Sequence, residues 1–261
     1  MRRPLTWFAA CAAAVLLTGG LAHAQCRAQS GKQTVALLEL YTSEGCSSCP
    51  PADNWFSGID LAPTSAIALA LHVDYWDRLG WKDRFASAGY TARQYEQMRR
   101  QQAAYVYTPQ VLLQGRDFRQ WGVRGEPASA VSAINARPSR AAVELLALAK
   151  GDMAQADVHV NVPETRDRSG TRVVVALVQD RLTSTVSAGE NAGKQLRHDH
   201  VVRQWHAAPG LDAAGDVRER IAFKLPSDSG PVSLVAFAED AATGDVLQAL
   251  ELPIVAACVS Q

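Results

Sequence analysis

Cys46 and Cys49, with two residues between them, are the residues of this chain best suited to chemistry. They follow an apolar run at 35–41 and precede two prolines, so the pair lies where a strand gives way to a helix. At such a junction two cysteines can close a small disulfide, and the helix dipole stabilises a thiolate. A thiolate attacks disulfides, whereas in a reducing compartment the same spacing holds metal. The compartment therefore decides the chemistry.

The N-terminus has the features of a secretory signal peptide. Two arginines precede an apolar stretch over residues 5–17, and small residues suited to cleavage follow at 22–24. We therefore expect a signal peptide over residues 1–24, a mature chain that starts at Gln25, and a periplasmic or secreted location. No later apolar run reaches the roughly 18 residues of a spanning helix, so we expect no transmembrane segment in the mature chain.

Removal of the signal peptide would leave four cysteines, Cys26, Cys46, Cys49 and Cys258, in an oxidising compartment. Three pairings are open to four cysteines. The short spacing favours Cys46 with Cys49, which leaves Cys26 to form a structural disulfide with Cys258. In the chain-entropy model this long bridge stabilises the fold by on the order of 4–5 kcal/mol. The alternative is two unrelated surface thiols.

Composition excludes several classes of protein. The chain has 26 basic and 26 acidic residues, without a basic stripe, so we expect neither a nucleic-acid partner nor an anionic membrane. No Ser-His-Asp order, glycine-rich phosphate loop or spaced carboxylate pair supports a hydrolase, a kinase or a glycosidase.

The pattern of elements changes near residue 138. Before it, predicted strands and helices alternate, which indicates an α/β thioredoxin-like domain over residues 25–138; the expected elements are strands at 34–41, 66–73 and 110–114 and helices after the cysteines, at 88–104 and at 127–136. After it, short segments alternate apolar and polar residues, which indicates an all-β, sandwich-like domain over residues 139–261; the expected strands are 158–162, 172–178, 200–205, 218–225, 232–238 and 246–254.

A second motif, Tyr107-Thr108-Pro109-Gln110, precedes a short apolar strand. Thioredoxin-like proteins carry a cis-proline at this place, beside the cysteine pair. Proline lacks an N–H and turns the backbone, so the preceding residue can offer its backbone to an extended substrate. We therefore predict a cis bond between Thr108 and Pro109.

Three segments, 40–53, 72–77 and 107–110, resemble the secreted bacterial family catalogued as domain of unknown function 1223, within the thioredoxin-like superfamily. The resemblance covers most of the mature chain. It implies the fold strongly and the activity weakly, because fold alone does not determine function.

The resemblance to thioredoxin-like oxidoreductases also implies roles. Cys46 would attack, Cys49 would resolve, and Tyr107, Thr108 and Pro109 would shape the substrate groove. The chain departs from that pattern in two places. Tandem prolines after the second cysteine favour a helix that begins there, which weakens the dipole at the first cysteine. Glycine replaces the usual tryptophan before the first cysteine, so we expect a thiol open to solvent.

Three polar residues are candidate modulators of the cysteines. His72 and Asp74 follow a strand that should end on the same rim of the sheet. His72 would act as a cation beside the thiolate, or would join Cys46 and Cys49 in a site suited to Cu(I) or zinc. The alternative is a histidine and an aspartate that bond to loop backbone. Three roles are open to Glu44: it would cap the helix, keep the loop soluble or oppose thiolate formation at Cys46.

Other clusters carry weaker signals. His198 and His200 would share one face of a strand, which fits a solvated face better than a metal site without a third ligand. The segment 189–193 reads as a turn. Four aromatic residues are candidates for a groove wall, for core packing or for a lid, namely Tyr75, Trp76, Trp81 and Phe85.

Together these patterns predict an exported thiol-disulfide oxidoreductase that needs no bound cofactor. Its partners would be disulfide-containing or thiol proteins of the cell envelope. One alternative is an envelope protein that binds or delivers copper or zinc with Cys46, Cys49 and His72. Another is a non-enzymatic binding module in which the same cysteines form a structural disulfide.

Overall fold

The computed structural model describes residues 26–59, 65–255 and 258. The expected signal peptide over residues 1–24 and the expected first mature residue, Gln25, lie outside the described residues. The helices and strands are, in chain order, β1 (Cys26–Gln29), β2 (Ala36–Thr42), α1 (Pro50–Ser57), β3 (Ala66–His72), η1 (Asp77–Leu79), α2 (Ala88–Arg100), β4 (Gln110–Leu113), β5 (Arg116–Asp117), η2 (Arg119–Gly122), α3 (Glu126–Asn135), β6 (Ala142–Lys150), β7 (Met153–Asn161), α4 (Thr165–Arg168), β8 (Thr171–Gln179), β9 (Leu182–Thr185), β10 (Gln195–His198), β11 (Val201–Ala207), β12 (Asp216–Lys224), β13 (Val232–Asp240) and β14 (Val246–Ile254).

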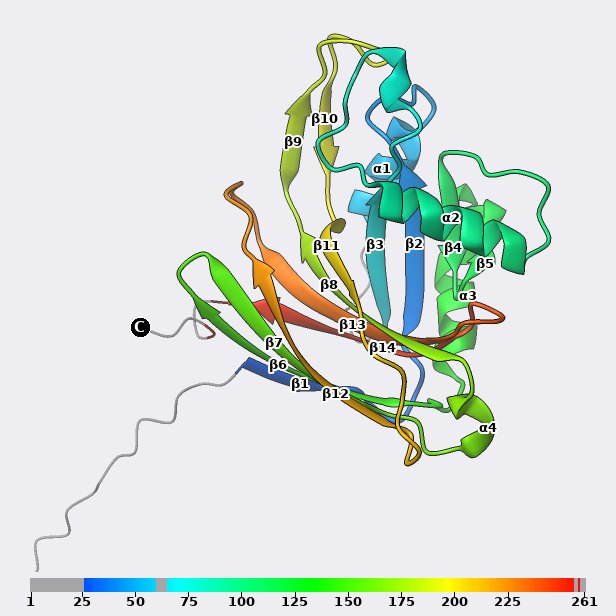
Figure 1. Cartoon of the computed structure of the whole chain (residues 1–261). Coiled ribbons are helices and arrows are strands. Elements are labelled where there is room, and N and C mark those ends of the chain that lie inside the picture. The colour runs from blue at the N-terminus through cyan, green and yellow to red at the C-terminus, as the bar shows by residue number, and fades with distance from the viewer. Residues whose placement is uncertain (1–25, 60–64, 256–257, 259–261) are drawn as a thin grey trace, which may run out of the picture.

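Most of the described strands belong to two large sheets (Figure 1). An eight-stranded sheet has the order β14-β13-β8-β11-β3-β2-β4-β5, and a four-stranded sheet has the order β1-β6-β7-β12. A separate hairpin pairs β9 with β10. The core between the two large sheets is built from valine, leucine and alanine side chains of both, with Phe223 from β12.

This architecture shows that the predicted fold class is wrong. Strands from both halves of the chain are neighbours in one eight-stranded sheet, so the protein is not an α/β thioredoxin-like domain followed by a separate all-β domain. The junction is β11, which pairs in parallel with β3 at Val201 and Ala70 and antiparallel with β8. Sequence periodicity shows which face a residue occupies, but it does not reveal which distant strand lies alongside.

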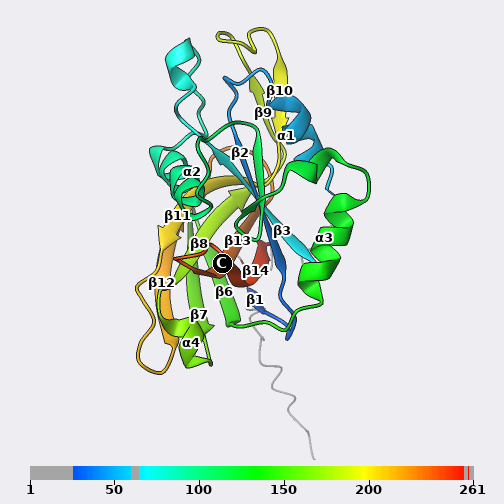
Figure 2. The same ribbon diagram turned by 90° about the vertical axis from the view of Figure 1, so that its right-hand side faces the viewer.

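Burial along the strands follows from the layers. Strands β6 and β7 alternate between buried and more exposed residues, because only one face of the four-stranded sheet meets the core. Strand β13 is buried at seven consecutive positions, because the eight-stranded sheet is covered on both faces. Helix α2 covers one face of that sheet, and α1 and α3 cover the other (Figure 2).

A buried ion network ties α2 to strands from both halves of the chain. Arg93 of α2 binds Glu39 of β2 through Nε at 2.7 Å and Glu239 of β13 through Nη2 at 2.9 Å. Their side chains are 5%, 1% and 0% exposed, respectively. Burial favours the neutral acid at Glu239, but Arg93 and Arg172 outweigh it and lower the pKa of Glu239 to about 2. The network therefore holds the Glu239 carboxylate as an ion within the core.

The two ends of the described chain are joined covalently. Cys26 at the start of β1 forms a disulfide with Cys258, with their Cα atoms 5.1 Å apart and a sequence separation of 232. None of the helices in the described residues has the length and apolar character needed to cross a membrane.

Arg93→Met should lower the free energy of unfolding by about 3–5 kcal/mol, because it leaves the buried Glu39 without its counter-ion and removes one of the counter-ions of Glu239. Urea unfolding followed by circular dichroism measures the change. Arg220→Met is the matched control: its guanidinium also binds a carboxylate, that of Asp157, but the side chain is 70% exposed. An exposed pair contributes little, so equal losses in the two variants would contradict the role of the buried network.

Candidate functional site

The cysteine pair lies in the loop between β2 and α1, at the upper end of the molecule in Figure 1. Cys46 and Cys49 form a disulfide, with their Cα atoms 5.4 Å apart. Helix α1 begins at Pro50, and Cys49 is its N-cap. Two prolines fit the first turn because the N–H groups there have no partner within the helix. Cys46 therefore lies outside the helix, and Cys49 lies at its positive end.

The Thr108–Pro109 peptide bond is cis, and it lies beside the disulfide. Thr108 Oγ1 donates a hydrogen bond to Cys46 Sγ at 3.3 Å. The same oxygen accepts a hydrogen bond from Trp76 Nε1 at 2.8 Å, which leaves the hydroxyl hydrogen free to point at the sulfur. Ser48 Oγ lies 3.3 Å from the same sulfur. Two hydroxyl groups thus contact Cys46 Sγ, and Trp76 holds one of them in place.

The disulfide is shielded from solvent, which shows that the expectation of an open thiol was wrong. Cys46 and Cys49 are both 0% exposed. Trp76 packs against this loop: a Cβ added to Gly45 would lie only 3.1 Å from Trp76 Cβ. The glycine therefore leaves room for Trp76 from another segment. Within residues 44–49, only Ser47 and Ser48, between the cysteines, are exposed.

The loop between β9 and β10 holds the cysteine loop from the second half of the chain. Asn191 Nδ2 donates to the carbonyl oxygens of Glu44 at 2.8 Å and of Cys46 at 2.9 Å, and Asn191 is fully buried. Glu190 accepts a hydrogen bond from the Ser47 N–H at 2.9 Å. Sequence reasoning treated 189–193 only as a turn. The available signal was an asparagine between turn glycines, which by itself does not identify the loop that it contacts.

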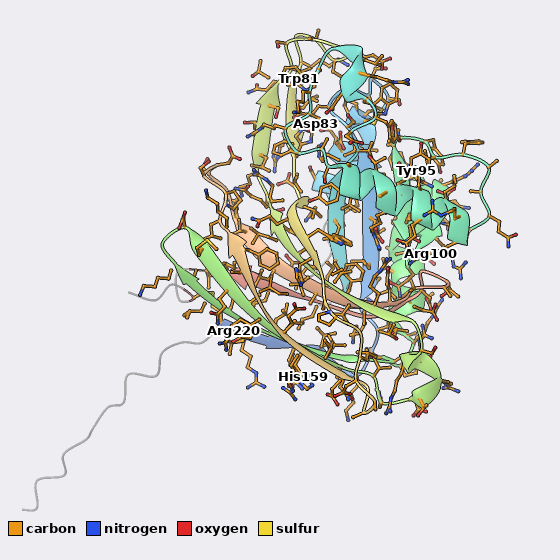
Figure 3. All side chains as sticks on the ribbon, viewed as in Figure 1. Trp81, Asp83, Tyr95, Arg100, His159 and Arg220 are labelled. Carbon is orange, nitrogen blue, oxygen red and sulfur yellow. A yellow bond between two sulfur atoms is a disulfide. The ribbon has the colours of Figure 1, made fainter. Side chains whose placement is uncertain are left out.

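The candidate modulators do not touch the sulfurs in the ways expected. His72 is buried, and its Nδ1 lies 2.7 Å from Asp83 Oδ2. Asp74 accepts a hydrogen bond from Thr91 of α2 at 2.6 Å. Glu44 accepts one from Trp81 Nε1 at 2.7 Å. In Figure 3 the labelled Trp81 and Asp83 lie at the end of the molecule that carries the cysteine loop.

The histidines of the second half are also placed differently from the expectation. His198 ends β10, whereas His200 lies beyond it with a φ of 59°, so the two do not share one strand face. His198 is 2% exposed, with Nε2 3.2 Å from Glu44 Oε1, and is not on a solvated surface. Among residues 26–59, 65–255 and 258, no group of three His, Cys, Asp or Glu side chains has an arrangement that holds a metal ion.

The aromatic residues divide between core and surface. Phe85 is buried against the rings of His72 and His198. Tyr107 is half-buried, and its hydroxyl donates to Asp117 at 2.7 Å. Its neighbour Tyr105 is 64% exposed. The segment before Thr108 therefore contains one tyrosine held by a hydrogen bond, Tyr107, and one exposed tyrosine, Tyr105.

Comparison with known proteins identifies the family. Residues 37–238 match the family described as "Protein of unknown function (DUF1223)", and the chain belongs to this family. No curated protein matches the chain significantly.

Two solved structures are similar to this one. Protein AGR_C_4864 from Agrobacterium tumefaciens is 27% identical with a TM-score of 0.57, over 85% of this chain and 96% of that chain. HBP35 of Porphyromonas gingivalis is 14% identical with a TM-score of 0.60, over 85% of this chain and 76% of that chain. The second likeness concerns the fold alone.

Asn191→Ala should loosen the cysteine loop, because it removes the donor for two carbonyl groups. We expect a loss of about 1–3 kcal/mol in the free energy of unfolding. We also expect faster reduction of the Cys46–Cys49 disulfide in the folded protein by dithiothreitol. Thr185→Ala, at an exposed position of β9, is the control. A reduction rate equal to that of the unaltered protein would contradict this role of Asn191.

Proposed function

We propose that this protein is an exported thiol-disulfide oxidoreductase in which Cys46 meets the substrate and Cys49 is the resolving cysteine. The observation that carries the proposal is the environment of Cys46 Sγ. Hydroxyl groups of Thr108 and Ser48 lie 3.3 Å from this sulfur. Hydroxyl donors at this distance stabilise a thiolate, which is the reactive form of cysteine.

The two sulfurs have different surroundings, which supports different roles. Hydroxyl groups of Ser48 and Thr108 contact Cys46 Sγ, whereas Cys49 is the N-cap of α1. A substrate thiolate would attack Cys46 Sγ, the Cys46–Cys49 bond would break, and its electron pair would go to Cys49 Sγ. A second substrate thiolate would then attack the mixed disulfide, which releases oxidised substrate and the Cys46 thiolate. The reverse sequence reduces a substrate.

Because Cys46 is fully buried, a substrate can reach it only if the side chains around it move. The side chains that shield it, Trp76 and Thr108, are only half-buried, and a hydrogen bond of 2.8 Å joins them. Displacement of Trp76 would break this bond and uncover the sulfur while the core of the sheet stays intact. The shielded form is then the resting, oxidised protein.

The expected location and partners belong to the same proposal. Two disulfides suit an oxidising compartment such as the periplasm or the extracellular space. Thiol or disulfide proteins of the cell envelope are the corresponding substrates. Metal delivery by Cys46, Cys49 and His72 has less support, because the sulfurs are bonded to each other and the His72 imidazole is bonded to Asp83.

Cys49→Ala should accumulate mixed disulfides between Cys46 and envelope proteins, because the resolving thiol is missing. Non-reducing electrophoresis and mass spectrometry of the captured species measure this. The double variant Cys46→Ala/Cys49→Ala is the control and should capture nothing. If the single variant captures no more than the double variant, the proposed function fails.

Thr108→Val should reduce the reactivity of Cys46 while keeping the shape of the side chain. A hydrogen bond to a charged group is worth about 1.5–3 kcal/mol, so the thiolate fraction should fall roughly tenfold or more. The rate at which iodoacetamide alkylates reduced Cys46 at neutral pH reports this fraction. Thr183→Val, at an exposed position of β9, should react like the unaltered protein. Equal rates in all three proteins would rule out thiolate stabilisation by Thr108.

A further inference from the structure

Five ionisable side chains are buried together beneath the cysteine loop. They come from five separate segments of the chain and are each at most 7% exposed; we call them the buried imidazole cluster, which consists of Glu44, Asp53, His72, Asp83 and His198. Ionisable groups are rarely buried unless they are paired or have a function. Neither the sulfur contacts nor the Arg93 network described above involves this cluster.

The members of the cluster contact one another. His72 Nδ1 lies 2.7 Å from Asp83 Oδ2, and His198 Nε2 lies 3.2 Å from Glu44 Oε1. The two imidazole rings meet edge to face with their centroids 5.0 Å apart. Thr42 donates a hydrogen bond to Asp53 at 2.7 Å. The two histidines and the carboxylates therefore form one connected group.

The cluster has more sites for protons than its hydrogen bonds occupy. One buried atom, His72 Nε2, has no hydrogen-bond partner, and His198 Nε2 and Glu44 Oε1 contact only each other, at 3.2 Å. A buried polar atom without a partner is costly, so its presence calls for an explanation. His72 Nε2 can bind or release a proton without breaking an existing hydrogen bond.

Charges within the cluster support proton storage. Burial opposes an imidazolium at His72, but Asp83 outweighs it and raises the pKa of His72. Burial raises the pKa of Asp53, an effect that His198 and His72 partly offset. Asp77, whose carboxylate accepts a hydrogen bond from the Asp83 N–H at 3.1 Å, adds a further negative charge nearby. These charges and the burial therefore favour a proton on His72 and on Asp53.

The cluster adjoins the resolving cysteine. Asp53 lies one helical turn after Cys49, and its N–H donates to the Cys49 carbonyl at 3.0 Å. Residues four apart lie on the same face of a helix. Thr42, which binds Asp53, is also the register partner of His72 across β2 and β3. Asp53 therefore shares a helix face with Cys49 and binds the residue that is paired with His72.

We propose that the buried imidazole cluster supplies, through Asp53, the proton that Cys49 takes up when the Cys46–Cys49 disulfide opens. This inference rests on the proposed function. Attack of a thiolate on Cys46 Sγ forms one S–S bond and breaks another, and the Cys49 thiolate leaves with the electron pair. Because Cys49 is fully buried, its negative charge is unfavourable there. Proton transfer from the cluster gives a neutral Cys49 thiol and leaves the negative charge on the cluster; closure of the disulfide returns the proton.

His72 and His198 are positioning residues in this scheme, because they act on the sulfur through Asp53. The test is the rate at which 2-mercaptoethanol opens the disulfide in the folded protein, divided by the thiolate fraction of the reagent. Between about pH 6 and 9, where histidines lose their protons, this corrected rate constant should fall as the pH rises. His198→Gln should shift this fall to higher pH, because His198 lowers the pKa of Asp53 and its removal lets Asp53 keep its proton.

His206→Gln is the matched control, because His206 also contacts a glutamate, Glu219, but is 39% exposed and outside the cluster. It should keep the rate and the pH profile of the unaltered protein. A flat corrected profile in the unaltered protein would overturn the inference without any variant, and so would an unchanged profile in His198→Gln.

Two further outcomes are distinguishable. If 2-mercaptoethanol opens the disulfide only after unfolding, the proposed function and this inference both fail. If the disulfide opens in the folded protein with a flat profile, only this inference fails. Stoichiometric zinc binding by the oxidised protein that is lost in His198→Gln would also overturn the inference, because the metal would occupy the imidazole nitrogens of the cluster.

Discussion

The burial of Arg93 between two carboxylates is the interaction on which the rest of the structure depends. The two halves of the chain meet in one sheet, yet β11 and β3 share a single register pair at their junction. Arg93 reinforces this junction because it binds Glu39 from the first half and Glu239 from the second. Without the guanidinium, the buried Glu39 would lose its ion-pair partner, which is far more costly than the loss of a surface ion pair.

Because the two halves of the chain share one sheet, residues from both halves contact the cysteine loop. The first half provides the disulfide and the Thr108–Pro109 turn beside it. The second half provides Asn191, which holds the loop carbonyls, and His198, which contacts Glu44 beneath the loop. The site is therefore completed by residues about 145 positions away in sequence. A buried disulfide held in this way is protected at rest, and its reactivity depends on small movements of Trp76 and Thr108.

Local patterns predicted local structure well. The strands at 66–73 and 246–254 and the helix near 127–136 lie within a residue of their observed bounds, because alternation and proline placement are visible within a short window. The cysteine pair and the cis bond at Pro109 were also found from spacing. The sheet that joins both halves was not, because pairing of β11 with β3 depends on contacts between distant segments. For the same reason, the contact of Asn191 with Cys46 could not be predicted. Nor could the packing of Trp76 against Gly45, the glycine that we expected to leave the sulfur open.

The central claim is that the Cys46–Cys49 disulfide opens and closes reversibly while the protein stays folded. Equilibration of the protein in glutathione buffers of graded potential, followed by acid quenching, thiol labelling and peptide mass spectrometry, tests it most directly. The account predicts two labelled cysteines, Cys46 and Cys49, with a midpoint above about −300 mV, while Cys26 and Cys258 stay oxidised and circular dichroism is unchanged. A midpoint below that potential, or labelling only upon unfolding, would contradict the account.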